Sequence, residues 1–202
     1  MRHRDTREKI LQAAEEVFAR DGFAGARIHE ISHKAGINQA MIYYYFSSKE
    51  SLYQAVLKQT FLRLNLKLSK ALTGNFGFPY KLRQLIEFYF DLVSQDNNLL
   101  RILQQELING GKHARQIAPP YIKQVYAMVR KLFEEAIASG ECRSMDIDSV
   151  LLAIFTLITF YYAASSMASF DQDASTLEPD IMERRKSELT ELILRGVKKN
   201  RG

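Results

Sequence analysis

Residues 28–52 of this 202-residue chain are IHEISHKAGINQAMIYYYFSSKESL, two short helical patterns separated by a tight turn. Gly36 lies in the turn, where a positive φ is easiest for a residue without a Cβ. Ser32 is small enough for the second helix to approach the first closely. The stretch therefore predicts helices at about 27–34 and 38–44 in a helix-turn-helix. The apolar side chains expected to fix the angle between these helices are Ile31, Ala35, Ile37, Ile42 and Tyr45.

A longer helix is expected before this pair. Asp5 and Glu8 have the spacing of a capping box, which predicts a helix over about residues 6–20. Gly22 is expected to end it, because glycine readily takes the left-handed conformation that satisfies the last carbonyls. The apolar stripe of this helix consists of Ile10, Leu11, Ala14, Val17 and Phe18.

The remaining chain shows helical patterns separated by short breaks. Ser47 or Ser48 is expected to cap a helix over about 48–70. Residues 73–79 interrupt the periodicity and form the best internal boundary. Glycines and prolines, including Pro119 and Pro120, then separate helices that we expect at about 80–95, 98–109, 119–139, 147–169 and 179–197.

Composition agrees with an all-α fold. The chain contains 4 Pro and 10 Gly, and long stretches lack both helix breakers, so a sheet is not expected. A hydrophobic content of 47% is sufficient to bury a core. The net charge of +5 is compatible with a polyanionic partner, although many soluble proteins are equally basic.

Two features predict a cytoplasmic protein without a membrane span. Cys142 is the single cysteine and cannot form an internal disulfide, and the N-terminus lacks an apolar signal-peptide core. Residues 149–170 contain no charged side chain, but several serines and threonines dilute their hydrophobicity, and no Lys/Arg cluster flanks them. We therefore expect a helix covered on both sides by protein.

A more specific signal follows the turn. Residues 42–52 resemble the signature of the TetR family of transcriptional regulators, an aliphatic residue, an aromatic pair, Phe, then Ser-Lys-Glu and Leu. Gly22 and Phe23 precede the motif at the family's spacing. The strong resemblance covers roughly residues 6–57, and the later region is similar only in its helix pattern.

The resemblance implies a DNA-binding regulator that acts as a homodimer on a palindromic operator in double-stranded DNA. Residues 1–47 would form the helix-turn-helix domain, and residues 48–202 a helical effector-binding and dimerisation domain reached through the helix at about 48–70. We expect a repressor released by an unidentified small, hydrophobic effector, without a cofactor. The alternatives are a DNA-associated structural protein that has no effector and, less well supported, an all-α enzyme.

Candidate base contacts lie at the start of the second helix of the motif. Gln39 is expected to read a base edge, and Ala40 or Met41 to touch a thymine methyl. Asn38 is interpreted equally well as a base contact or as a helix N-cap. Many family members have Thr-Thr or Ser-Thr where this chain has Ala26-Arg27, and Arg27 is expected to replace the lost phosphate contact.

Candidate phosphate contacts lie further along the motif. The resemblance makes at least one of Tyr43 and Tyr44 a phosphate ligand through its hydroxyl, whereas Tyr45 and Phe46 are expected to pack inward. Lys49 lies in the first turn of the following helix, where backbone N–H groups also point toward an anion. We therefore expect Lys49 to bind a phosphate of the DNA backbone.

The C-terminal region is rich in aromatic residues. These residues are most simply explained as core, but together with polar side chains they are also typical of a small-molecule pocket. The candidate effector-binding residues are Phe88, Gln105, Tyr126, Phe155 and Tyr162. Family resemblance places the dimer interface on the last two helices, and its candidates are Ile158, Tyr162, Leu189, Leu192 and Ile193.

No catalytic or metal-binding motif is expected. His29 and His33 are one helical turn apart, but no cysteine or further histidine joins them, so surface histidines are the preferred interpretation. Cys142 and His113 have no recognisable triad partners in the sequence. The sequence therefore predicts a binding protein rather than an enzyme.

Overall fold

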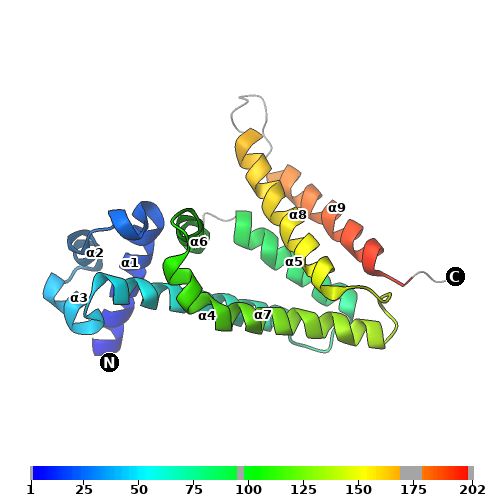
Figure 1. Ribbon diagram of the computed structural model, residues 1–202, viewed down its shortest axis with the longest axis horizontal. Helices are drawn as coiled ribbons and strands as arrows, with labels where there is room; N and C mark the ends of the chain where they lie inside the picture. Colours follow the sequence, from blue (N-terminus) through cyan, green and yellow to red (C-terminus); the bar gives the residue numbers. More distant parts are fainter. Residues whose placement is uncertain (1, 95–97, 169–178, 200–202) are drawn as a thin grey trace. The chain divides into compact units, whose positions relative to one another are not determined.

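The computed structural model describes residues 2–94, 98–168 and 179–199, and Figure 1 shows their arrangement in helices. Within these ranges the all-α prediction is confirmed, because the described elements are helices and the pairing Cys142–Lys198 is an isolated bridge. The helices are α1 Arg2–Gly25, α2 Ile28–Ala35, α3 Gln39–Phe46, α4 Lys49–Leu72, α5 Phe78–Ser94, α6 Asn98–Ile108, α7 Lys112–Ala138, α8 Ile147–Ala168 and α9 Pro179–Val197.

The chain divides into two compact units. Unit 1 comprises residues 1–66 and 96–123, and unit 2 comprises residues 67–95 and 124–202. Two of the three points at which the chain passes from one unit to the other fall within long helices, α4 and α7. Unit 1 therefore includes α6 and the start of α7 as well as the helix-turn-helix, so its packing extends beyond the predicted domain of residues 1–47.

Unit 1 is built around α1. This helix packs against α2 and α6, and α2 packs against α3. The predicted apolar stripe of α1 is buried in the resulting core, together with Ile31 and Ile42 of the motif. The core closes with side chains from the first half of α4, namely Leu52, Tyr53, Val56 and Leu57.

Gly22 interrupts α1 as predicted, but the helix does not end there. Gly22 has φ 67° and ψ 179°, and one further helical turn follows it before α2. A Cβ at this position would lie 3.1 Å from the Gln105 side-chain oxygen of α6. Glycine is therefore favoured by the backbone conformation, while the Gln105 side chain would have to shift slightly to admit a Cβ.

Unit 2 is organised around α5. This helix packs against both α8 and α9, and its apolar face is buried through Leu82, Leu85, Ile86 and Phe90. The Phe78 and Phe133 rings contact edge to face at 5.1 Å. The core of unit 2 therefore includes side chains from both α5 and α7.

The start of α7 differs from the prediction. The prolines at positions 119 and 120 were expected to precede a helix at about 119–139, whereas α7 begins at Lys112 and both prolines lie inside it. The Glu106 carboxylate accepts the N–H groups of His113 and Ala114 at 3.0 and 2.9 Å, which caps the first turn of α7. This cap and the burial of His113 stabilise the seven residues before Pro119.

The described helices do not include one that is long and apolar enough to cross a membrane. Cys142 is buried and has a free thiol, and burial, together with the nearby charge of Glu141, raises its pKa to about 11.

Candidate nucleic-acid interface

The turn between α2 and α3 has the predicted geometry. Gly36 adopts the left-handed conformation, with φ 66° and ψ 36°, and its N–H donates to the His33 carbonyl at 3.1 Å. The Ile37 N–H donates to the Ser32 carbonyl at 3.0 Å. Ser32 is buried, and its hydroxyl donates to the His29 carbonyl at 2.8 Å. These bonds end α2 and fix the turn that leads into α3, and none of them uses a side chain of α3.

Asn38 caps α3. Its side-chain oxygen accepts the Ala40 N–H at 3.0 Å, so one of the two interpretations of Asn38 is realised in the free protein. Gln39 and Ala40, the first residues of α3, are partly exposed and exposed. Arg27 precedes α2 in an extended conformation with an exposed side chain that makes no capping hydrogen bond.

The aromatic residues of α3 separate into outward and inward groups, as predicted. Tyr43 and Tyr44 are 50% and 72% exposed, whereas Phe46 is buried. Tyr45 is half-buried and packs against the core of unit 1. The exposed tyrosines place two hydroxyl groups on the same short helix that begins with Gln39, a suitable arrangement for phosphate contacts beside base contacts.

Lys49 is less available than the sequence indicated. Its ammonium group donates to the Ala24 carbonyl at 3.2 Å and lies 4.9 Å above the centre of the Phe23 ring. Partial burial lowers the pKa of Lys49 below its usual value. Lys49 therefore holds the start of α4 against the end of α1, and a phosphate would have to share or replace these contacts.

A buried polar cluster centred on Glu106 lies in unit 1 and was missed by the sequence interpretation. The Glu106 carboxylate accepts the Tyr53 hydroxyl at 2.9 Å, in addition to the two backbone N–H groups of α7. His113 Nδ1 lies 3.0 Å from the same carboxylate and donates to it, because an ionised carboxylate only accepts. Glu106 thus joins α4, α6 and α7.

The pKa of Glu106 reflects these contacts. Burial alone would raise it, but the hydrogen bonds from the Ala114 N–H, His113 and Tyr53 lower it, and the net pKa lies below the usual value. Burial and the bond to Glu106 raise the pKa of Tyr53. Glu106 is therefore held as a carboxylate inside unit 1. The only sequence signal for it was an acidic residue seven positions before His113, which is too common to identify a cap.

The candidate effector residues are divided between the two units. Gln105 belongs to unit 1 and lies beside Gly22. In unit 2, Tyr89 of α5 contacts both Phe88 and Phe155, with ring centres 5.9 and 6.3 Å apart. Tyr126 is exposed, and its hydroxyl donates to Asp148. The side chain of Tyr162 lies outside the described residues.

The apolar surface of α8 corrects part of the predicted dimer interface. Ile158 and Ile193 are buried within the chain itself, so they were wrong as interface candidates. Leu189 is half-buried and Leu192 is 63% exposed. Among the described side chains of α8, the large exposed ones are instead Leu152, Phe155, Leu157 and Phe160.

His29 and His33 are exposed on α2, in agreement with the surface interpretation. Among the side chains that the structure describes, no group of three or more histidine, cysteine or acidic residues is placed to hold a metal ion.

Comparison with protein families covers most of the chain. Residues 10–56 match the model of bacterial regulatory proteins of the tetR family, and residues 80–193 match the tetracyclin repressor-like C-terminal domain. The HTH-type transcriptional repressor NicS of Pseudomonas putida is 31% identical over 201 residues, covering 96% of this chain and 93% of NicS. The fatty acid metabolism regulator protein of Bacillus subtilis is 27% identical over 135 residues, 67% of this chain and 70% of that protein.

Solved structures share the fold. The regulator FadR from Bacillus subtilis, determined in complex with stearoyl-CoA, has a TM-score of 0.73 at 24% identity, covering 94% of this chain and 98% of FadR. A putative transcriptional regulator from Streptomyces coelicolor has a TM-score of 0.69 at 25% identity, covering 95% and 98%. The matched relatives are transcriptional regulators and not enzymes. The chain belongs to the TetR family of DNA-binding transcriptional regulators.

Proposed function

We propose that this regulator is a cytoplasmic repressor that binds a palindromic operator as a homodimer and is released by a small hydrophobic effector. The observation that carries the proposal is the exposed face of α3. Gln39, Tyr43 and Tyr44 point away from the core on a helix whose angle is fixed by the Gly36 turn. The similarity to the repressor NicS favours repression over activation.

Specificity in this proposal comes from the start of α3. The Gln39 amide can pair bidentately with adenine in the major groove. Asn38 keeps its capping bond to Ala40, and Ala40 contacts a thymine methyl. Arg27, Tyr43, Tyr44 and Lys49 hold the DNA backbone and fix the position of α3 without reading sequence.

Dimerisation is needed because two recognition helices must reach major grooves about 34–36 Å apart on a palindrome. The exposed apolar side chains of α8, with Leu192 of α9, are suited to bury against a second copy. Among the α8 side chains that the structure describes, the buried ones are Ile147, Ile154 and Ile158, and the exposed apolar side chains between them are left for a partner.

Release by an effector requires a ligand that binds the two states of the dimer with different affinities. The aromatic residues Phe88, Tyr89 and Phe155 of unit 2 support a hydrophobic ligand. Tyr126 would have to exchange its bond to Asp148 for one to the ligand. Gln105 and Tyr162 remain candidate polar contacts.

The proposal is tested by selecting random duplex DNA on the purified protein at a stated salt concentration. We expect a palindrome to be enriched, Gln39→Ala to relax the base preference at one position of each half-site, and Tyr44→Phe to weaken binding to all sequences similarly. Tyr80→Phe is a matched control, since Tyr80 is an exposed tyrosine of unit 2. Enrichment that ignores both α3 substitutions would overturn the assignment of α3.

A further inference from the structure

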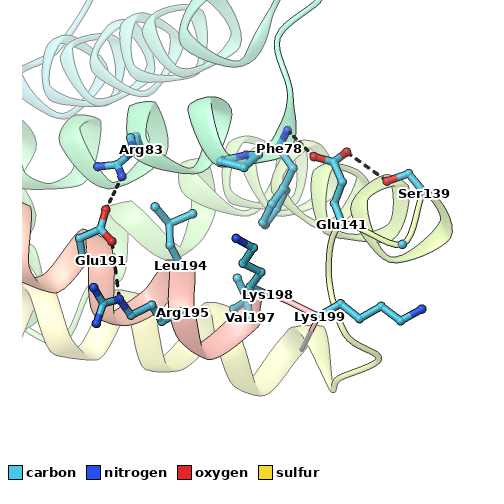
Figure 2. Close-up of a pocket in the computed structure, with 12 residues that line it drawn as sticks. Phe78, Arg83, Ser139, Glu141, Glu191, Leu194, Arg195, Val197, Lys198 and Lys199 are labelled. Carbon is cyan, nitrogen blue, oxygen red and sulfur yellow. Dashed lines mark hydrogen bonds and ion pairs between the residues drawn. The ribbon is translucent and has the colours of Figure 1, made fainter. Parts of the chain in front are cut away.

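A groove of about 1020 Å³ lies within unit 2, between the start of α5, the residues after α7 and the end of α9 (Figure 2). Ligand sites commonly enclose about 300–1,000 Å³, so the groove is large enough for a small molecule. Its lining includes the apolar side chains of Phe78, Pro79, Leu194 and Val197. None of the effector candidates whose side chains are described lines it.

The walls of the groove are held by bonds between distant segments. The Arg143 N–H donates to the Val197 carbonyl at 3.1 Å, and Arg143 Nε donates to the Gly196 carbonyl at 2.8 Å. Glu141 accepts the Phe78 N–H at 3.3 Å and caps the start of α5. The groove is therefore largely formed before any ligand binds, which lowers the entropy cost of binding.

Its charges are not balanced. Glu191 forms ion pairs with Arg83 and, at 3.8 Å, with Arg195. The Glu141 carboxylate accepts hydrogen bonds from the Phe78 N–H and, at 3.1 Å, from the Ser139 hydroxyl. Two further cations, Lys198 and Lys199, line the groove, and their ammonium groups make no ion pair with the side chains that the structure describes. Figure 2 shows Lys198 reaching between Leu194 and Phe78, whereas Lys199 points away.

A simpler role for Lys198 would be to neutralise the carbonyl end of α9. That role is already filled, because Arg143 bonds to the carbonyls of Gly196 and Val197. The Leu194 carbonyl accepts the Lys198 backbone N–H at 3.0 Å. The Lys198 ammonium is therefore left as a cation above an apolar floor.

We infer that this groove is a second ligand site, which binds an organic anion through Lys198 and an apolar body through Phe78, Leu194 and Val197. The acidic group can be a carboxylate, a phosphate or a sulfonate, since each accepts hydrogen bonds from an ammonium group. The site is distinct from the effector residues proposed above and does not depend on them.

The test uses anilinonaphthalene sulfonate and phenylnaphthylamine, fluorescent probes with the same rings, of which only the first is charged. With full-length protein we expect Lys198→Ala to weaken sulfonate binding about tenfold, as for loss of a charged hydrogen bond, and to leave the neutral probe unchanged. Lys199→Ala is the matched control and should change neither. Leu194→Trp, which fills the floor, should abolish binding of both probes at this site, while its thermal unfolding midpoint checks that the fold is intact.

Hydrogen exchange locates the bound sulfonate probe, including any copy held by the apolar surface of α8. We expect slower exchange of the amides of residues 139–143 and 194–199. Unchanged exchange there, or equal effects of Lys198→Ala and Lys199→Ala on the sulfonate, would overturn the inference. Operator binding is not part of the readout, so failure of the site and failure of the proposed function can be told apart.

Discussion

The outer faces of α3 and α8 expose large side chains of different chemistry. α3 exposes Tyr43 and Tyr44, whose rings end in hydroxyl groups, whereas α8 exposes the pure hydrocarbon of Leu152 and Phe160. Hydroxyl groups can donate hydrogen bonds to phosphate oxygens. An exposed hydrocarbon side chain contributes to stability only when another apolar surface covers it. The comparison indicates that α3 is built to meet a polar partner and α8 an apolar one.

The largest effect is expected from a charge in the apolar surface of α8. Phe160→Arg should weaken the dimer more than about 100-fold, because a buried unpaired charge costs several kcal/mol. Analytical ultracentrifugation over a range of protein concentrations measures the change.

Phe76→Arg is the control for this substitution. Phe76 is also an exposed phenylalanine, but it lies outside α8. Its exposed fraction is 54%, against 71% for Phe160. Equal behaviour of the two variants would mean that α8 is no special contact surface, and the comparison with α3 would then fail.

The next largest effect is a loss of unfolding free energy at Glu106, in the core of unit 1 against which α3 packs. Glu106→Gln keeps the shape of the side chain but weakens its bonds to Tyr53, His113 and α7, which should cost about 1–3 kcal/mol of unfolding free energy. Urea unfolding at pH 7 measures this loss. Tyr53→Phe, which removes a single donor, should cost less, and equal stability of Glu106→Gln and the unmodified protein would contradict the assigned cap.

The pH dependence gives a separate check on Glu106. Its pKa is lowered in the folded protein, so its contribution is fully present above the unfolded-state pKa of about 4.3 and is lost as pH falls through the folded value. The stability difference between the unmodified protein and Glu106→Gln should therefore shrink below about pH 4. A constant difference across this range would argue against an ionised Glu106.

A smaller effect distinguishes phosphate binding by Lys49 from its structural contacts with Ala24 and Phe23. Lys49→Met keeps a flexible apolar side chain at this position but removes the charge, and should weaken operator binding about tenfold and reduce the salt dependence by about one ion. Thermal unfolding should change little, because the ammonium group makes one exposed hydrogen bond to Ala24 and one cation–π contact with Phe23, and the cation–π contact is worth about 0.5–1 kcal/mol at an exposed site. A loss of stability without a change in salt dependence would show that the role is structural only.

The smallest effect is expected at Asn38. Asn38→Ser preserves a cap for α3 and should leave both stability and base preference nearly unchanged, whereas Asn38→Ala should cost about 1 kcal/mol. Repeating the DNA selection with Asn38→Ser distinguishes the alternatives. A new base preference at one position would assign a base contact to Asn38 in addition to its cap.

The local elements were predictable from sequence because their signals are local. The Gly36 turn, the Ser48 cap of α4 and the interruption at Gly22 all follow from backbone rules that act over a few residues. The start of α7 was not predictable, since the cap comes from Glu106 on another helix and overrides the breaking tendency of Pro119 and Pro120.

In the candidate nucleic-acid interface, too, local features were predictable from the sequence, whereas contacts between distant residues were not. The outward direction of Tyr43 and Tyr44 follows from helical periodicity. The engagement of Lys49 by Ala24 and Phe23 depends on residues about 25 positions away, which no spacing rule reveals. Burial of Ile158 and Ile193 was missed for a related reason, because an apolar helix does not disclose which stripe faces its own chain.

The most direct test is the mass of the complex with the selected operator, measured by native mass spectrometry and supported by titration of a duplex that carries one half-site. The proposal predicts two chains on each palindrome and affinity for the half-site at least about tenfold weaker. A single chain on the palindrome, with equal affinity for the half-site, would contradict the assignment of α8 as the surface that pairs two α3 helices.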